Sequence, residues 1–233
     1  MFAIIGACLF SVVIILSLLI IKNSLHRDGC VSYFECADGL CLKKQKRKIH
    51  NDSACAGFCG LFLEGFRHFL TFSKDEELKK KLLFEIFDPA LFKCCLEGEK
   101  VLGLLGLATN ELRPLNFKKE SCIKYFGKFK GELISSQMNA IFQKPVVKQK
   151  DELYIDVLVT GSEARRKGIG SALLNHAFSL ESYSTFYVEV FSNNQPAIKL
   201  YEKNGFSIEK CEKLSLMRFL GAGYPIKMVR RTH

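Results

Sequence analysis

The residues best suited to chemistry form the run Arg165-Arg166-Lys167-Gly168-Ile169-Gly170, between a predicted strand and a predicted helix. The first turn of a helix presents unpaired backbone N–H groups and a partial positive charge. Glycine lets a phosphate approach the backbone closely, and the three cationic side chains add charge around it. We therefore predict an anion-binding loop. It is neither a P-loop, which ends in Gly-Lys-Ser/Thr, nor a dinucleotide fingerprint with three glycines.

The elements that must position this loop follow from periodicity. A strand at 153–159 leads into the loop, and an amphipathic helix at about 171–180 follows it. A second strand at 185–191 and a short helix at 195–203 come next. The remaining predicted elements are helical segments at 61–72 and 73–89, strands at 91–96, 101–109, 206–209 and 226–230, and a partly helical insertion at 110–151. This order indicates an α/β or α+β domain over 54–233.

Two motifs in the second half of the chain carry a family resemblance. The first is Tyr154-Ile-Asp-Val-Leu-Val159 followed by the Arg-x-x-Gly-x-Gly loop, and the second is Asn194-Gln-Pro-Ala-Ile-Lys-Leu-Tyr-Glu-Lys-Asn-Gly-Phe206. In order and spacing they resemble the GNAT superfamily of N-acetyltransferases over roughly 153–206. The resemblance implies a central mixed β-sheet flanked by helices, and an enzyme that uses acetyl-CoA as cosubstrate and needs no metal.

The same resemblance implies a site. It places the pyrophosphate on the loop and the pantetheine arm between splayed strands. The expected acetyl-CoA-binding residues are Leu158, Val159, Arg165, Arg166, Lys167, Gly168, Ile169, Gly170, Ser171 and Asn194. In this family a free amine attacks the thioester directly, without an acyl-enzyme intermediate. Asn194 is also expected to cap the short helix.

Proton transfer requires an acid and a base. Tyr201 occupies the family's general-acid position, from which it would protonate the leaving CoA thiolate; ordinary packing against the sheet is the alternative role. The stretch from Val188 to Tyr201 is similar to the branch that acetylates ribosomal-protein N-termini, which implies Glu189 as base. Asp156 and a water relay are the other candidates for the base, and either carboxylate could instead be a salt-bridge partner.

Residues 1–21 contain no charged side chain and are rich in Ile, Leu and Val. At about 1.5 Å per residue, such a helix would span roughly 30 Å, the thickness of a bilayer core. We expect an uncleaved transmembrane anchor; a cleaved signal peptide and a buried segment are alternatives. The basic residues lie after this segment, so the positive-inside rule predicts a single-pass membrane protein with a cytoplasmic catalytic domain.

Residues 22–53 read as a basic, Cys-containing linker. The run Lys43–Lys48 could contact anionic lipid or be an ordinary solvated segment. The cysteine spacings lack the paired pattern of a zinc site, and the cytoplasm would keep the thiols reduced. Cys94, Cys95 and Cys122 lie among apolar residues, which predicts that they are small core side chains.

The net charge of +10 suits an anionic partner, but the basic residues are spread along the chain, so a nucleic acid is disfavoured. The leading hypothesis is transfer of an acetyl group to an amine on a small molecule, a protein N-terminus or a lysine. One alternative is a non-catalytic acyl-CoA-binding module at a membrane surface. Another is a membrane-surface interaction protein that acts through its basic linker.

Overall fold

The structure is a computed structural model that describes residues 52–66, 70, 72–98, 100–143, 146–214 and 223–232. The predicted anchor at 1–21 and nearly all of the predicted linker lie outside these residues. Helix α2 begins at Asp52, two residues before the predicted start of the domain at residue 54.

The described elements follow the predicted order closely. The helices are α2 (Asp52–Phe66), α3 (Glu76–Ile86), α4 (Lys119–Phe126), α5 (Lys128–Phe142), α6 (Ile169–Phe178) and α7 (Gln195–Lys203), with short 3-10 turns at Pro89–Leu91 and Ser162–Ala164. The strands are β1 (Phe92–Glu97), β2 (Lys100–Ala108), β3 (Glu152–Thr160), β4 (Thr185–Phe191), β5 (Ser207–Cys211) and β6 (Pro225–Arg231).

The six described strands form one sheet in the order β1-β2-β3-β4-β6-β5. Only the β3–β4 pair is parallel, because α6 crosses over between these two strands; the other pairs are antiparallel. The predicted mixed sheet flanked by helices is therefore confirmed.

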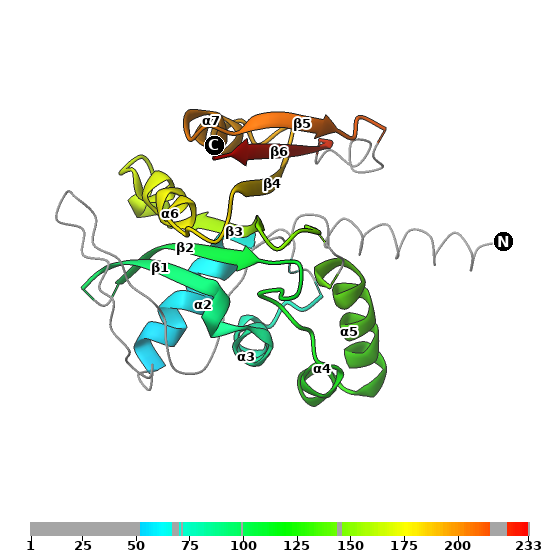
Figure 1. The fold of residues 1–233 in the computed structure, drawn as a ribbon. Helices are drawn as coiled ribbons and strands as arrows, with labels where there is room; N and C mark the ends of the chain where they lie inside the picture. Colours follow the sequence, from blue (N-terminus) through cyan, green and yellow to red (C-terminus); the bar gives the residue numbers. More distant parts are fainter. Residues whose placement is uncertain are drawn as a thin grey trace.

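Helices cover both faces of the sheet (Figure 1). Helix α6 lies over one face, where Leu173 and Leu174 pack with Leu105 and Phe186 in one apolar cluster. Helices α2 and α3 lie on the other face in a second cluster that contains Val157 and Val159. Strand β3 contributes side chains to both clusters, so packing on both faces of the sheet determines which way its side chains point.

The sheet opens between β3 and β4. These strands pair at three positions, the last being Tyr154 opposite Tyr187. Beyond that point β3 keeps pairing with β2 as far as Thr160, whereas β4 keeps pairing with β6 as far as Phe191. Figure 1 shows β4, β5 and β6 departing from the plane of β3. The splayed strands predicted for the pantetheine arm are present.

A β-bulge occurs in β3 where the opening begins. Val157 pairs with Gly106 and Ile155 with Leu107, so Asp156 is an extra residue with no partner in the β2 register. Bulges bend a strand and re-aim its side chains, and they are frequent beside active sites. The bulge thus turns β3 at the position where it leaves β4.

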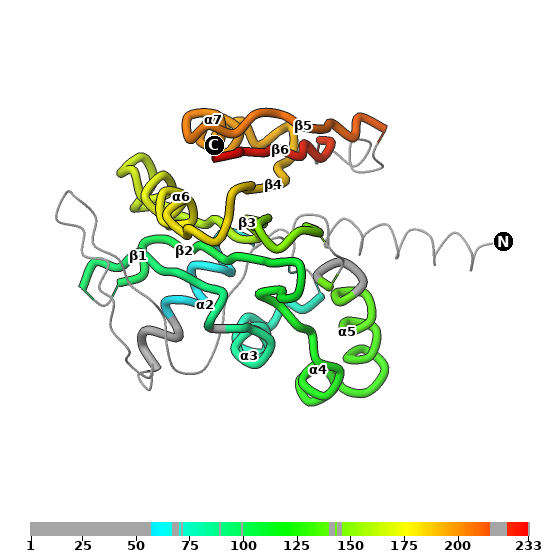
Figure 2. The backbone as a smooth tube through the Cα atoms, in the orientation of Figure 1, coloured from blue at the N-terminus to red at the C-terminus, as the bar shows by residue number. Residues whose placement is uncertain are grey.

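The insertion at 110–151 contributes two helices on one side of the molecule. Figure 2 traces the chain from β2 past α3 into α4 and α5 before it returns to β3. The side chains of Ser135 and Asn139 on α5 hydrogen-bond to the carbonyl of Phe117, at 2.7 and 2.9 Å. Ile134 and Met138 of α5 lie in the same apolar cluster as Leu82 and Leu83 of α3, so the insertion is packed against the domain rather than projecting from it.

The cysteines that the structure describes in the core are free thiols. Cys94, Cys95 and Cys122 are buried, as predicted for small core side chains. Burial raises the pKa of Cys122 to about 12, so this thiol stays protonated. Within the described part of the chain, no helix has both the length and the apolar composition needed to cross a membrane.

Candidate functional site

The predicted anion-binding loop connects β3 to α6, and two of its residues just before the helix have positive φ angles. Gly168 precedes the first helical residue with φ +80°. Arg166 has φ +62° and is the one described non-glycine residue with positive φ. Among the described residues, the backbone N–H groups of 166–171 find no acceptor. They include the first N–H groups of α6, which point out of the N-terminal end of the helix, as in anion-binding turns.

The side chains of the loop add positive charge at the N-terminus of α6, where the helix dipole is also positive. Arg165, Arg166 and Lys167 are exposed, and none forms an ion pair with another described residue. Cations at a helix N-terminus oppose the macrodipole, and a non-glycine residue at positive φ costs about 1–2 kcal/mol. Two local costs in one loop are typical of a functional site.

The two loop glycines have different roles. Gly168 needs its positive φ, and a Cβ there would meet open space. At Gly170 a Cβ would lie 3.0 Å from Cδ2 of Leu200, so this glycine lets α6 approach α7 closely. The sequence predicted that both glycines bring the backbone near a phosphate. For Gly170 the structure shows close helix packing, and its approach to a phosphate stays a prediction.

Four other predicted cofactor residues lie on β3 and at the starts of α6 and α7. Leu158 and Val159 pair with β2 in the part of β3 that β4 has left, so their backbone lies at the opened edge. Ser171 accepts a hydrogen bond at 3.0 Å from Nδ2 of Asn204, which ties the start of α6 to the end of α7. The predicted cap is confirmed: Oδ1 of Asn194 accepts from the backbone N–H of Ala197 at 3.3 Å.

Tyr201 projects from α7 into the cluster shared by α6 and β4. Its ring meets the ring of Phe206 edge-on, with centroids 5.6 Å apart, and the residue is 7% exposed. Burial raises its pKa, so the phenol keeps its proton at neutral pH. Its hydroxyl finds no hydrogen-bond partner among the described residues. The residue can therefore donate a proton to a ligand.

Glu189 and Tyr154 lie on the other side of the opening. Strand alternation places Glu189 on the face of Tyr187, opposite Val188 and Val190, which pack with Tyr201. Tyr154, in the last residue pair before the strands part, is 2% exposed. Burial raises its pKa, and nearby Glu189 and then Asp156 raise it further. The charge of Arg113 acts in the opposite direction and lowers the pKa of Tyr154.

Asp156 is held in a buried ion pair. Nη2 of Arg113 lies 3.1 Å from Oδ2 of Asp156, with side-chain exposures of 6% and 0%. This arrangement corrects the suggestion that Asp156 is a base, because a base needs a carboxylate that the substrate can reach. The salt-bridge alternative is the one that the structure supports, although the partner is not a residue of the loop.

Sequence reasoning missed Arg113 and Tyr154. A charged residue in an apolar strand needs a buried partner, so Asp156 in the sequence already predicted that such a partner exists. It could not identify the partner, which lies 43 positions away in the insertion.

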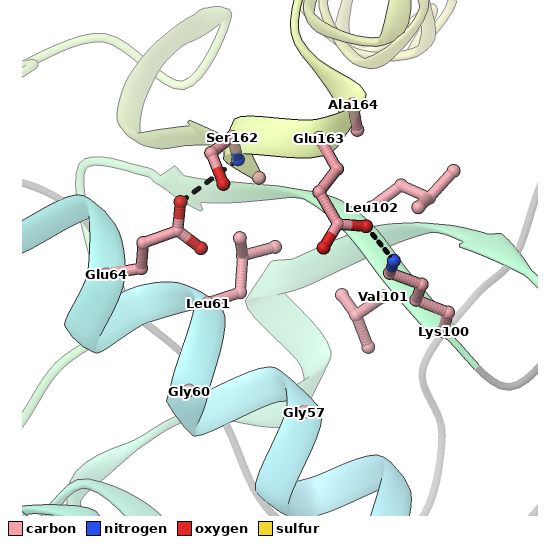
Figure 3. A pocket seen from close by; sticks show the side chains of 11 residues that line it. Gly57, Gly60, Leu61, Glu64, Lys100, Val101, Leu102, Ser162, Glu163 and Ala164 are labelled. Carbon is pink, nitrogen blue, oxygen red and sulfur yellow. Dashed lines mark hydrogen bonds and ion pairs between the residues drawn. The ribbon is translucent and has the colours of Figure 1, made fainter.

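A pocket of about 320 Å³ lies beside the loop but not within the opening (Figure 3). It is lined by α2, the start of β2 and the turn Gly161–Ala164, and by none of the predicted cofactor residues. Glu64 accepts a hydrogen bond at 3.0 Å from the backbone N–H of Ser162, and Lys100 pairs with Glu163 across it. These contacts brace the turn that leads into the loop.

The described residues include no group of three His, Cys, Asp or Glu side chains arranged to hold a metal ion. Near the opening, the described residues present a helix N-terminus, a buried phenol and a strand carboxylate.

Comparison with known proteins places this arrangement in a family. A sequence model of the acetyltransferase (GNAT) family matches residues 61–206, more than half of the chain. No curated protein matches the chain. The sequence-based prediction of an N-acetyltransferase of this family is confirmed.

Solved structures share the fold at low identity. An acetyltransferase structure matches with TM-score 0.49 and 16% identity, covering 78% of this chain and 96% of its own. The ribosomal-protein-S18-alanine N-acetyltransferase of Escherichia coli matches with TM-score 0.41 and 17% identity, covering 70% and 79%. A Bacillus anthracis str. Ames protein in complex with acetyl coenzyme A, assigned as a streptothricin acetyltransferase, has TM-score 0.41 and 17% identity. That match covers 61% of this chain and 62% of the Bacillus chain. The assignment rests on the family match, because these values are low.

Proposed function

We propose that this chain, which belongs to the acetyltransferase (GNAT) family, transfers an acetyl group from acetyl-CoA directly to a primary amine. The observation that carries the proposal is the parting of β3 and β4 after Tyr154, at a strand that leads into the open N-terminus of α6. A thioester arm can lie in this opening while its pyrophosphate reaches the helix N-terminus.

The cofactor would be held mainly by backbone groups. The N–H groups of 166–171 would take the pyrophosphate, helped by the charges of Arg165, Arg166 and Lys167. The backbone of Leu158 and Val159 would bind the pantetheine arm along the opened edge of β3. Asn194, at the start of α7, is proposed as a further contact.

The reaction balances without a covalent enzyme intermediate. The neutral amine attacks the thioester carbonyl, a C–N bond forms, and the C–S bond breaks. The CoA thiolate leaves and takes the phenolic proton of Tyr201, while the proton of the amine passes to Glu189 or to water. The raised pKa of Tyr201 supports its role, because an acid must carry its proton at working pH.

The acceptor is proposed only as a class. It is a primary amine on a small molecule, a protein N-terminus or a lysine, and it approaches the opening from the face that carries Glu189. The Escherichia coli protein of similar fold acts on ribosomal protein S18. Its acceptor class is one of several to test in this chain.

The location of the enzyme is also a proposal. Residues 1–21 would anchor the chain, 22–53 would link it, and 54–233 would form the cytoplasmic catalytic domain. Membrane lipid would contact the anchor and Lys43–Lys48.

Calorimetric titration of acetyl-CoA into the full-length protein tests the cofactor site. Gly168→Glu places a bulky anion in the loop at a position that needs φ +80°. We expect micromolar binding by the wild type and at least a tenfold loss in Gly168→Glu, because the added carboxylate repels the pyrophosphate. Gly127→Glu is the matched control. It introduces the same charge at an exposed glycine of φ +75°, between α4 and α5, and should leave binding unchanged.

The same samples separate binding from turnover. A folded wild-type protein that does not bind acetyl-CoA would refute the proposal. Binding without transfer to any of a peptide N-terminus, lysine amide, spermidine, kanamycin or glucosamine would favour a non-catalytic acyl-CoA-binding module.

A further inference from the structure

The Arg113–Asp156 ion pair joins the insertion to the point where the sheet opens. Asp156 is the extra residue of the β3 bulge, and Arg113 belongs to the segment that follows β2. Both oxygens of the carboxylate accept from Nη2 of Arg113, at 3.3 and 3.1 Å. The pair is almost completely shielded from solvent, so removing one partner leaves a buried charge that has lost its ion pair.

The segment that carries Arg113 is held from two sides. On one side, the N–H of Asp88 donates to the carbonyl of Pro114 at 3.0 Å, next to a β-bridge between Phe87 and Leu115. On the other side, the N–H of Phe117 donates to Oδ1 of Asn139 on α5 at 2.9 Å. A turn precedes Arg113, in which the N–H of Thr109 donates to the carbonyl of Leu112 at 2.9 Å. The segment 109–117 is thus a braced wall whose third attachment is the ion pair.

The ion pair lies at the point where the sheet opens, because Asp156 is two residues beyond Tyr154, the last β3 residue that pairs with β4. Asp156 and Arg113 both act on the pKa of buried Tyr154, in opposite directions, and Glu189 raises it as Asp156 does. Other charged and titratable groups also lie near Glu189. Lys227 is opposite Glu189 on β6, and Tyr187 lies on the same face of β4. After the larger effect of Glu212, the charge of Glu189 also contributes to raising the pKa of Lys210 on β5. Lys227 itself pairs with Glu209 at 2.8 Å.

We infer that Arg113 is a positioning residue for acetyl transfer: through Asp156 it fixes segment 109–117 as a wall of the acceptor site and neutralises a carboxylate beside Tyr154 and Glu189. The inference rests on the proposed function. It gives the insertion at 110–151 a role at the acceptor side. It also assigns Asp156 to the ion pair and leaves the proton to Glu189.

A double-mutant cycle on the full-length protein tests the inference. The variants are Arg113→Gln, Asp156→Asn and the double variant, with Lys124→Gln as the matched control. Lys124 also forms an ion pair from the insertion, with Glu85 on α3, but away from β3. The measurements are acetyl-CoA affinity, urea unfolding, and the pH profile and KM of transfer to whichever of the five amines above reacts fastest with the wild type.

The two single variants should act in opposite directions. In Arg113→Gln the uncompensated Asp156 should move the acid limb of kcat/KM upward by roughly half to one pH unit. In Asp156→Asn the uncompensated Arg113 should move it downward by a similar amount. Both should raise the KM for the amine about tenfold or more, and acetyl-CoA affinity should stay unchanged. The double variant has no net charge at this pair, so its acid limb should return to the wild-type position. Lys124→Gln should change neither the acid limb nor the KM for the amine.

Other outcomes overturn the inference in distinguishable ways. If the single variants lower only the unfolding midpoint and leave the acid limb and the KM in place, the pair is merely structural. If Asp156→Asn and the double variant both lose kcat, Asp156 is the base. If the wild type binds acetyl-CoA but acetylates none of the amines, the proposed function and this inference fail together.

Discussion

The hydroxyl of Tyr201 is the atom on which the proposed proton transfer depends. The ring packs against Phe206 and inside the cluster of α6 and β4, and these contacts would persist in phenylalanine. Because the hydroxyl has no hydrogen-bond partner among the described residues, its removal should cost the fold little. A change at this position therefore reports on chemistry rather than on packing.

We predict that Tyr201→Phe lowers kcat about 100-fold, because the leaving thiolate loses its proton donor. The affinity for acetyl-CoA and the thermal midpoint should stay close to wild type. Tyr183→Phe, in the connection between α6 and β4, is the matched control and should keep full activity. Steady-state kinetics and calorimetry make the comparison. Full turnover in Tyr201→Phe would show that the tyrosine only packs.

At the residue scale, local motifs predicted the side chains whose role depends only on their neighbours in the sequence. Asn194 caps α7 as its type and position indicated, and Gly205 ends the same helix with φ +84°. Arg113 could not be predicted, because its role exists only when two distant segments meet. Its surroundings in the sequence, Leu112 and Pro114, give no sign of a buried ion pair.

At the element scale, bounds were predictable where a strong local signal starts or stops an element. Helix α7 has the predicted bounds, set by an Asn cap and an Asn-Gly end. Helix α6 begins at Ile169 rather than at Ser171, because Gly168 adopts the left-handed conformation and lets the helix start immediately after it. The bulge at Asp156 was not predictable, since a bulge is a property of the β2–β3 register.

The junction of α3 and α4 supplies a prediction on stability. Glu85 on α3 receives hydrogen bonds from Lys124 and Tyr125 on α4, and these bonds connect the insertion to the domain. Burial alone would raise the pKa of Glu85, but the hydrogen bonds outweigh it and lower the pKa from 4.5 to about 2. Because the folded-state pKa is the lower one, the stabilisation is full above about pH 4.5 and is lost as the pH falls toward 2.

We therefore expect Glu85→Gln to lower the thermal midpoint at pH 7 by several degrees, at roughly 2–4 °C for each kcal/mol lost in a chain of this size. The difference from wild type should shrink as the pH falls from 4.5 toward 2, because Glu85 of the wild type becomes protonated and loses its charge over this range. Glu77→Gln removes an exposed pair with Lys80 and should change the midpoint little at any pH. Calorimetric scans across this range make the test, and a difference independent of pH would exclude an electrostatic origin.

At the scale of the whole molecule, the sheet consists of two parts that meet at few positions. The part β1-β2-β3 carries α2 and α3, and the part β4-β6-β5 carries α7 (Figure 1). Three residue pairs and the shared apolar cluster under α6 hold them together. This sparse pairing leaves the opening in which we propose that acetyl-CoA binds, beside the ion pair that joins the insertion to β3. The family resemblance predicted the opening, whereas the role of the insertion required its contacts.

The last prediction concerns residues 1–21, whose lack of charged side chains led us to propose a membrane anchor. In fractionated cells, the full-length protein should stay with membranes after alkaline carbonate extraction, because an apolar span resists removal where a charge-bound protein does not. Deletion of 1–21 should release it into the carbonate supernatant. Replacing the basic residues of Lys43–Lys48 with glutamine should leave the protein membrane-bound, since lipid charges contribute about 1 kcal/mol per basic side chain and are screened by salt. A carboxy-terminal tag should be digested by protease added outside sealed microsomes, as the positive-inside rule requires. Complete release of the full-length protein by carbonate would refute the anchor, and a protected tag would reverse its orientation.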